Sequence, residues 1–136
     1  MRVHHIGYLT KKMEETEPLF RQLGFSPQGE MCYDNDRIAY ILFLCKDGYV
    51  VELIQPTGEQ SPLYSLLKRY KNTPYHICYE VQELAKEVQN LILEGYRVIR
   101  EREKAIALHN REVVFLQHPS MGIIELLNAE QSKGGC

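Results

Sequence analysis

The chain repeats itself at an offset of 71 residues, from His5 to His76. The segment HIGYLTKKMEETEPLFRQLGF (residues 5–25) aligns without a gap with HICYEVQELAKEVQNLILEGY (residues 76–96). The later parts of the two copies, DRIAYIL…GYVVELI and NREVVFL…GIIELL, resemble each other in order and character, with one small shift in spacing. A solenoid repeat has a shorter period, of about 20 to 50 residues. The repeat therefore predicts a duplicated module and not an open array of small units.

Each copy of the repeat predicts one strand, one helix and up to three further strands. In the first copy, alternating residues predict a strand over 3–9, and apolar residues at helical spacing predict a helix over 11–23 that Gly24 ends. The apolar face of this helix consists of Met13, Phe20 and Leu23. The later strands of this copy lie near residues 30–34, 37–45 and 49–54. The second copy has its elements near residues 75–81, 82–94, 97–103, 111–117 and 122–127. The predicted fold class is α+β, with two tandem βαβββ modules forming a cupped mixed sheet and helices on its outer face.

The length of 136 residues suits one domain built from both modules. In the segment between the copies, Pro56-Thr57-Gly58 predicts a turn, and Ser61-Pro62 opens a short helix through about Tyr70. The predicted boundaries are a first module at 1–54, a linker with a short helix at 55–74, a second module at 75–127 and a polar tail at 128–136.

Composition excludes several classes of function. A net charge of −2 gives no basic excess for nucleic acid, and the longest apolar runs are too short to span a membrane. The N-terminus lacks the pattern of a secretory signal, and the cysteines are widely spaced, which favours reduced thiols. The four cysteines are Cys32, Cys45, Cys78 and Cys136. We therefore expect a cytoplasmic protein that binds neither nucleic acid nor membranes.

Four polar residues stand at equivalent positions of the two copies. Strand alternation places Ile77 toward the helix of its module and His76 on the opposite, concave side, and the same parity holds for His5. Glu52 and Glu125 each interrupt an apolar strand, in VVELI and IIELL. A carboxylate inside such a strand is costly unless it is paired or bound to a metal.

Two histidines and two glutamates form a ligand set of nitrogen and oxygen atoms that suits Zn, Ni, Co, Mn or Fe(II). A lone strand histidine is more often a hydrogen-bonded structural residue, and a lone strand glutamate is more often an ion-pair partner. The presence of the whole set in duplicate favours a metal site instead. If the two modules pack with pseudo-two-fold symmetry, His5, Glu52, His76 and Glu125 converge on one point.

Other charged residues leave two interpretations open. Arg37 and Arg111 occupy matching positions of the repeat and could hold an anionic group of a substrate, or could be solvated charges at strand edges. The segment SLLKRYK is mildly basic and could meet phosphates, or could be an amphipathic connector. The sequence contains no phosphate-binding glycine loop, no G-x-S-x-G motif and no plausible nucleophilic triad.

These motifs carry a family resemblance. The paired H-I-x-Y…G-[FY] segments, with VELIQP and GIIELL closing the two copies, resemble the vicinal oxygen chelate superfamily over nearly the whole chain. That superfamily includes glyoxalase I, methylmalonyl-CoA epimerase, extradiol dioxygenases, and fosfomycin and bleomycin resistance proteins. The resemblance implies paired βαβββ modules around one divalent metal ion (Zn, Ni, Co or Mn) and a homodimer. The implied metal ligands are His5, Glu52, His76 and Glu125.

Two branches of the superfamily compete. The stretch VELIQPTGEQSPLYSLLKR…PYHICYEV resembles methylmalonyl-CoA epimerases, which have a similar S-P helix before the second module. The His/Glu/His/Glu set fits glyoxalase I fully, whereas epimerases can carry Gln at the position of Glu52. The stretch KAIALHNREVVFLQHP also departs from the glycine-rich segment of epimerases. The bleomycin-binding branch lacks the set of four ligands.

The resemblance implies a metal-dependent isomerase or lyase that removes a proton next to the carbonyl of a thioester or thiol adduct. It implies that Glu125 is the base and Glu52 its partner. We expect epimerisation of an acyl thioester. The alternative is the lactoylglutathione lyase reaction, in which a hemithioacetal of a 2-oxoaldehyde is isomerised, and a further alternative is a non-catalytic protein that binds a ligand or drug. No carboxylate aligns with the second base that some epimerases have near the strand RIAYIL.

Overall fold

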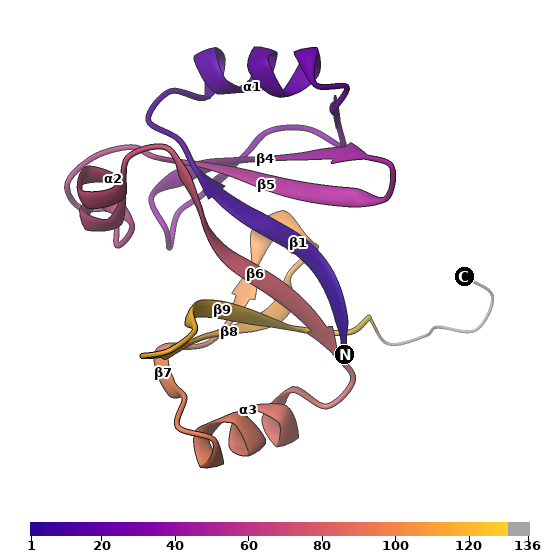
Figure 1. Ribbon diagram of the computed structural model, residues 1–136, viewed down its shortest axis with the longest axis vertical. Coiled ribbons are helices and arrows are strands. Elements are labelled where there is room, and N and C mark those ends of the chain that lie inside the picture. The colour runs from indigo at the N-terminus through magenta and orange to yellow at the C-terminus, as the bar shows by residue number, and fades with distance from the viewer. Residues whose placement is uncertain (131–136) are drawn as a thin grey trace. The chain divides into compact units, whose positions relative to one another are not determined.

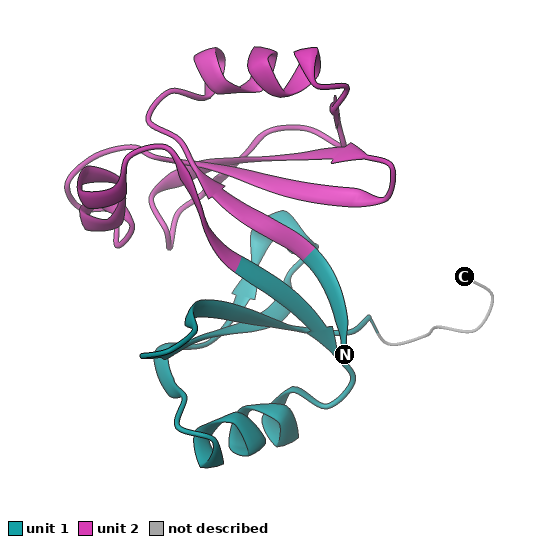
Figure 2. Cartoon of the chain, viewed as in Figure 1, with its two compact units in different colours: residues 1–4, 77–136 teal, residues 5–76 magenta. Residues whose placement is uncertain are grey.

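A computed structural model describes residues 1–130 of the chain. This part of the chain contains nine β-strands, three α-helices and one short 3-10 helix (Figure 1). It divides into two compact units, which Figure 2 shows in different colours. Unit 2 consists of residues 5–76, and unit 1 consists of residues 1–4 and the chain from residue 77 onward. Strands β1 (Arg2–Leu9) and β6 (Thr73–Val81) each contribute residues to both units. Cys136 and most of the polar tail lie outside the described residues.

Unit 2 contains the first copy of the repeat and the segment that follows it. Its elements after β1 are α1 (Met13–Gln22), β2 (Ser26–Pro27), β3 (Cys32–Asp34), β4 (Ala39–Lys46), β5 (Tyr49–Pro56) and α2 (Tyr64–Tyr70). The strands lie in the order β2-β4-β5-β1, with β3 also paired to β4. Strand β1 runs parallel to β5, and the β4–β5 pair is antiparallel. Since every strand but β1 is joined by short turns, the local sequence favours this antiparallel arrangement.

Helix α1 covers one face of the unit 2 sheet. Met13 on the helix packs with Leu44 and Leu53 of the sheet, and Phe20 adds a partly buried ring to the same cluster. The helix ends at Gln22, and Gly24 takes a positive φ of 97° while the amide of Phe25 donates to the carbonyl of Phe20. Leu23 is 64% exposed, so its predicted place on the apolar face is wrong. The chain turns away from the sheet before Leu23 can reach it.

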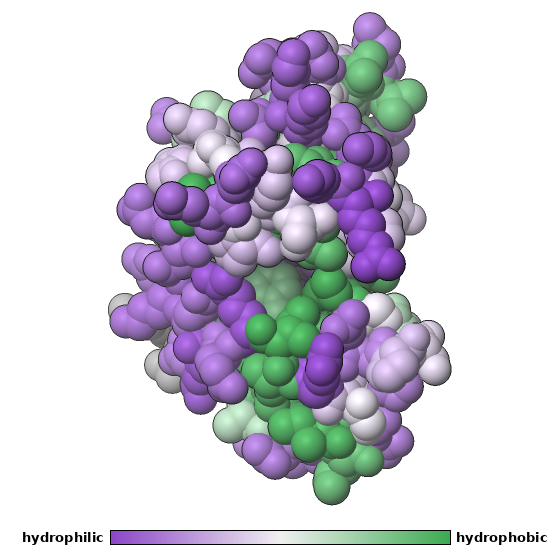
Figure 3. Space-filling view, turned by 90° about the vertical axis from the view of Figure 1, so that its left-hand side faces the viewer, coloured by the Kyte–Doolittle hydropathy of each residue, from purple (hydrophilic) through white to green (hydrophobic). Residues whose placement is uncertain are grey.

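Unit 1 contains the second copy. Its further elements are α3 (Leu84–Leu93), β7 (Arg97–Ala105), the 3-10 helix η1 (Ile106–Leu108), β8 (Arg111–His118) and β9 (Gly122–Asn128). The strands lie in the order β6-β9-β8-β7. Leu84 of α3 packs against alternate residues of the sheet, including Leu116 and Leu126. Large apolar side chains also reach the surface of this unit, as the green regions of Figure 3 illustrate, and Leu93 is among the most exposed of them.

The predicted order of elements is confirmed in both copies. Each has a strand, a helix and then antiparallel strands, so the α+β class with paired βαβββ modules is confirmed. The two-residue strand β2 and the 3-10 helix η1 were not predicted, because elements of two or three residues carry no periodic signal. Strand β5 extends to Pro56, two residues past its predicted end, because a proline is tolerated at the end of a strand. Among the described residues, no helix is both long and apolar enough to cross a membrane.

An ion cluster joins four strands of unit 1. The guanidinium of Arg111 donates to Glu80 and to the carbonyl of Asn128, and Arg2 donates to the other oxygen of Glu80. Arg111 is mostly buried, so it is not a solvated edge charge. Burial raises the pKa of Glu80, but the hydrogen bonds from Arg111 and Arg2 outweigh it, and the pKa lies below its ordinary range.

This lowered pKa predicts how stability depends on pH. Because the folded protein favours the ionised form of Glu80, the stabilisation is complete above the unfolded-state pKa of about 4.3 and is lost as the pH falls through the lower, folded-state value. We therefore expect Glu80→Gln to lower the free energy of unfolding at pH 7 and to flatten its decline below pH 5. Urea unfolding of both proteins between pH 7 and pH 3 measures this, and parallel curves would contradict it.

Candidate metal centre

Three strands of unit 2 bring His5, Glu52 and His76 together. In the parallel pair β1–β5, Gly7 lies opposite Glu52, and His5 shares the face of Gly7 because it lies two residues earlier on β1. His76 comes from β6. The three residues are 1%, 0% and 4% exposed, respectively, although each has a polar or ionisable side chain. Strand alternation predicted this inward orientation for each of them.

The three side chains offer ligand atoms at distances that suit a shared metal ion. His5 Nε2 lies 3.3 Å from His76 Nε2, and Glu52 Oε1 lies 3.4 Å from His5 Nε2 and 3.8 Å from His76 Nε2. A metal bound at about 2.0–2.2 Å from each ligand holds its neighbouring ligand atoms about 3.0–3.5 Å apart. Two of the three separations fall in this interval and the third exceeds it by 0.3 Å. The residues present therefore fit a divalent ion with mixed nitrogen and oxygen ligands.

Aromatic rings surround the two imidazoles. The ring of Phe43 packs edge-on against His5 with centroids 5.4 Å apart, and Tyr75 packs against His76 at 4.4 Å. Such rings exclude water and lower the local dielectric, which strengthens electrostatic interactions at the centre. They also limit the rotation of the imidazoles, so the two Nε2 atoms are held facing each other.

Gly7 makes room for His76. A Cβ atom at this position would lie 2.0 Å from Cε1 and 2.2 Å from Nδ1 of the His76 ring, which is closer than real side-chain contacts. Glycine is therefore required here by the close approach of β6 to β1, and it is one of the positions that sets the place of the imidazole.

We expect Gly7→Ala to displace His76 and weaken metal binding at least about tenfold, because a misplaced ligand raises the cost of assembling the site. Overpacking of this kind also lowers the free energy of unfolding, by about 1–3 kcal/mol. Calorimetric titration with Zn²⁺ and urea unfolding measure the two effects. The control is Gly48→Ala, which strains a turn with a φ of 82° but meets no neighbouring atom within 4 Å. It should cost stability and leave zinc affinity unchanged, and equal zinc affinity in both variants would contradict the role of Gly7.

Arg37 and Asp34 form a buried extension of the site. Arg37 is 3% exposed, and its Nη1 lies 3.7 Å from Glu52 Oε1 while its Nε lies 3.7 Å from Asp34 Oδ2. The interpretation of Arg37 as a solvated edge charge is therefore wrong. Asp34 Oδ1 accepts the backbone N–H groups of Asp36 and Arg37, so this carboxylate shapes the turn between β3 and β4.

Sequence reasoning missed Asp34, and it found no carboxylate near the strand RIAYIL. The available signal was the segment Tyr33-Asp34-Asn35-Asp36, whose polar residues are typical of a turn in which an aspartate caps its own backbone. Such a turn does not reveal whether the aspartate faces solvent or the interior. The structure buries it beside Arg37.

Cys32 lies at the start of β3, close to the same charges. Burial raises the pKa of its thiol, and the carboxylates of Asp34 and Glu52 raise it further against the opposing effect of Arg37. These surroundings disfavour the thiolate form of Cys32.

Glu125 lies in the other unit. It belongs to β9 of unit 1, opposite Phe115 of β8, and it is fully buried between Ile124 and Leu126. Of the four residues that the sequence singles out, unit 2 holds three together. The participation of Glu125 as fourth ligand and as base stays a prediction.

Comparisons with known proteins place the chain in a family. Residues 4–129 match the family model described as Glyoxalase/Bleomycin resistance protein/Dioxygenase superfamily. A mitochondrial methylmalonyl-CoA epimerase of Dictyostelium discoideum is 27% identical over 92% of this chain and 76% of its own length. An ethylmalonyl-CoA/methylmalonyl-CoA epimerase of Cereibacter sphaeroides is 29% identical over 87% of this chain and 88% of its own length.

Solved structures share the fold. A hypothetical protein from Bacillus halodurans superposes with a TM-score of 0.84 at 21% identity, covering 98% of both chains. Methylmalonyl-CoA epimerase from Mycobacterium tuberculosis superposes with a TM-score of 0.80 at 19% identity, covering 96% of this chain and 89% of that one. With the duplicated βαβββ module and the match to the family model, the chain belongs to the glyoxalase/bleomycin resistance/dioxygenase superfamily.

Proposed function

We propose that the protein is a divalent-metal-dependent epimerase that inverts the α-carbon of an acyl thioester, as in methylmalonyl-CoA. The observation that carries the proposal is the buried His5–Glu52–His76 set, with ligand atoms 3.3–3.8 Å apart. The curated relatives named as methylmalonyl-CoA epimerases support the choice of reaction. A relative structure, that of the Streptomyces coelicolor epimerase in complex with 2-nitronate-propionyl-CoA, supports a coenzyme A thioester as substrate.

His5, Glu52 and His76 would hold the metal ion, with Glu125 as the fourth ligand. A divalent cation held there would supply Lewis acidity that stabilises negative charge on the thioester oxygen. The buried Glu52 carboxylate and the two imidazoles would gain from a cation the compensation that buried polar groups need.

The chain's own carboxylates would move the proton. Glu125 would accept the α-proton, and the electron pair of the broken C–H bond would be delocalised into the thioester carbonyl. Inversion requires that a proton return to the opposite face of the carbon, and a protonated Glu52 would donate it. This transfer would leave Glu125 protonated and Glu52 ionised, and proton exchange with solvent would restore both groups. Asp34 is less suited to this role, because its oxygens hold the turn amides and face Arg37.

Arg37 would bind the free carboxylate of the substrate. Its guanidinium is buried beside Glu52, and a buried guanidinium favours a planar, bidentate anion such as a carboxylate. A malonyl-type thioester carries such a free carboxylate next to the carbon that is inverted. Asp34 would position the guanidinium, since its Oδ2 lies 3.7 Å from Arg37 Nε while Arg37 Nη1 faces Glu52.

Glyoxalase I chemistry is the second candidate. The observation in its favour is Glu52 itself, because a glutamate at this position completes the His/Glu/His/Glu set of that branch. The same carboxylates could move a proton between neighbouring carbons of a thiol hemithioacetal. A non-catalytic ligand-binding role is the third candidate, and the complete ligand set speaks against it.

The decisive comparison uses two substrates with the metal-loaded protein. Racemic methylmalonyl-CoA in heavy water should acquire deuterium at its α-carbon, while the hemithioacetal of methylglyoxal and glutathione should not be isomerised to the lactoyl thioester. Turnover of methylglyoxal alone would replace the proposal with glyoxalase chemistry. A homodimer and a cytoplasmic location stay predictions.

A further inference from the structure

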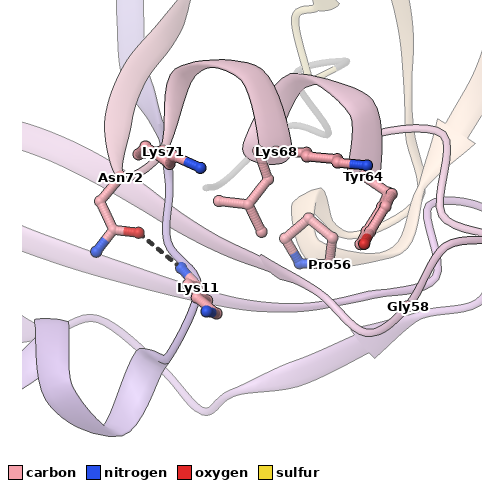
Figure 4. Close-up of a pocket in the computed structure, with 8 residues that line it drawn as sticks. Lys11, Pro56, Gly58, Tyr64, Lys68, Lys71 and Asn72 are labelled. Carbon is pink, nitrogen blue, oxygen red and sulfur yellow. Dashed lines mark hydrogen bonds between the residues drawn. The ribbon is translucent and has the colours of Figure 1, made fainter.

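A pocket lies in unit 2, beside helix α2. Its volume is about 350 Å³, and Figure 4 shows it between the helix, the end of β5 and the segment that follows β1. Pro56 and Leu67 are buried and supply its apolar surface, and Tyr64 adds an aromatic ring. The pocket combines this apolar lining with a concentration of positive charge.

Three lysines line the pocket, and none of its lining residues carries a carboxylate. Lys68 lies four residues after Tyr64, so these two residues share one face of the helix. Lys71 directly follows the helix and also lines the pocket. Lys11 comes from a different segment, and its backbone N–H donates to Asn72 Oδ1 at 2.9 Å, which ties the two segments together (Figure 4). Like charges gathered around one cavity repel one another, and an anion in the cavity would relieve that repulsion.

The backbone at Lys71 is also unusual. It takes φ 63° and ψ −157°, a conformation adopted almost only by glycine, and its amide donates to the carbonyl of Leu67. A glycine here would form the same turn without strain. The strain at Lys71 makes it a position where the effect of the side chain can be tested by replacement with glycine.

We propose that this pocket binds the phosphate groups of the nucleotide carrier of the substrate, with the apolar lining against its aromatic base. The proposal rests on the proposed function, in which the substrate is a thioester of coenzyme A. Glu52 and Pro56 belong to the same strand and lie four residues apart, a separation of about 13 Å. The extended pantetheine arm of coenzyme A can cover this span between thioester and phosphates.

Binding tests the site without any turnover. Coenzyme A alone and adenosine 3′,5′-bisphosphate are titrated calorimetrically into the protein and into the double variant Lys68→Gln/Lys71→Gln. We expect the double variant to bind both at least about tenfold more weakly, because charge-assisted hydrogen bonds to phosphate are lost. The matched control, Lys86→Gln/Lys104→Gln, makes the same change of net charge in unit 1 and should bind as the wild type does. Equal loss in both variants, or inorganic phosphate binding as tightly as coenzyme A, would overturn the assignment.

Kinetics separates this proposal from the proposed function. The same acyl group is presented on coenzyme A and on N-acetylcysteamine, which has no phosphates. The double variant should raise KM for the coenzyme A thioester about tenfold, leave its kcat unchanged and leave the short thioester unaffected. If the wild-type protein has no epimerase activity but the double variant still binds coenzyme A more weakly than it, the pocket assignment stands and the proposed function is rejected. If the double variant is active and keeps the wild-type affinity for coenzyme A and the wild-type KM for its thioester, the pocket assignment is rejected and the proposed function stands.

The variant Lys71→Gly separates loss of the lysine side chain from loss of folding as the cause of weaker coenzyme A binding. The glycine relieves the strained backbone, so the melting temperature should stay the same or rise. Weaker coenzyme A binding in this variant then reports the lysine side chain itself. Unchanged coenzyme A affinity in a fully folded Lys71→Gly variant would count against a phosphate contact at this position.

Discussion

Replacement of Glu125 by Gln is expected to slow exchange of the substrate α-proton at least about a hundredfold. A positioned general base contributes about 10²- to 10⁴-fold, and an amide of the same shape cannot accept the proton. The strand should persist, because Glu125 is flanked by the buried residues Ile124 and Leu126 and because Gln conserves its volume. Deuterium incorporation into racemic methylmalonyl-CoA, followed by NMR or mass spectrometry, gives the rate.

Metal content must be measured in the same Glu125→Gln samples. If the variant retains its metal and loses exchange, Glu125 is the base; if it loses both, Glu125 is a ligand and the loss of exchange follows from the loss of metal. The matched control is Glu101→Gln on β7 of the same unit, which is exposed and should exchange as the wild type does. Exchange by Glu125→Gln at more than half the wild-type rate would remove this residue from the mechanism.

His76→Ala is expected to lower the affinity for Zn²⁺ or Co²⁺ by more than about 100-fold. Loss of a residue that only supports a ligand typically costs about 10- to 100-fold, and His76 is itself a proposed ligand. The expectation follows from His76 Nε2 lying 3.3 Å from His5 Nε2 and 3.8 Å from Glu52 Oε1, because removal of the imidazole deletes one donor of the set. Wild-type protein should melt at a higher temperature when saturating metal is present, since the metal binds the folded state. The variant should lose that shift.

The control for His76→Ala is His109→Asn. His109 is exposed and has a φ of 57°, a conformation that asparagine tolerates, so the substitution removes an imidazole without straining the turn. This protein should keep the wild-type metal affinity and thermal shift. Metal-induced stabilisation of His76→Ala equal to that of wild type would mean that the buried histidines serve only to pack the sheet.

The repeat made most of the fold predictable. Because the side-chain period of a strand is two, the parity of His5 in β1 and of His76 in β6 followed directly once the strands were located. Glu52 stood out because an ionisable residue interrupts an otherwise apolar strand, and burial confirms that it faces inward. These inferences need only local periodicity, and the duplication supplied an independent copy of each.

Features that depend on turns and on close approach were not predictable. The sequence could not show that the aspartate of the β3–β4 turn faces Arg37 in the interior, because an Asx turn looks the same at the surface. Nor could it show that Gly7 is required by the His76 ring, since that contact joins strands far apart in the sequence. The sequence alone does not decide between the two interpretations of SLLKRYK, because Lys11 joins Lys68 and Lys71 only in the folded unit.

One measurement tests the central claim most directly: the rate of α-deuterium incorporation into methylmalonyl-CoA as the metal-stripped protein is titrated with a divalent metal. We expect exchange to be absent without metal, to rise with occupancy and to reach its plateau at one metal ion per chain, with His5→Ala inactive at the same metal concentration. Exchange at the full rate in stripped protein, or a His5→Ala variant that exchanges and binds metal as the wild type does, would contradict a metal centre built on His5, Glu52 and His76.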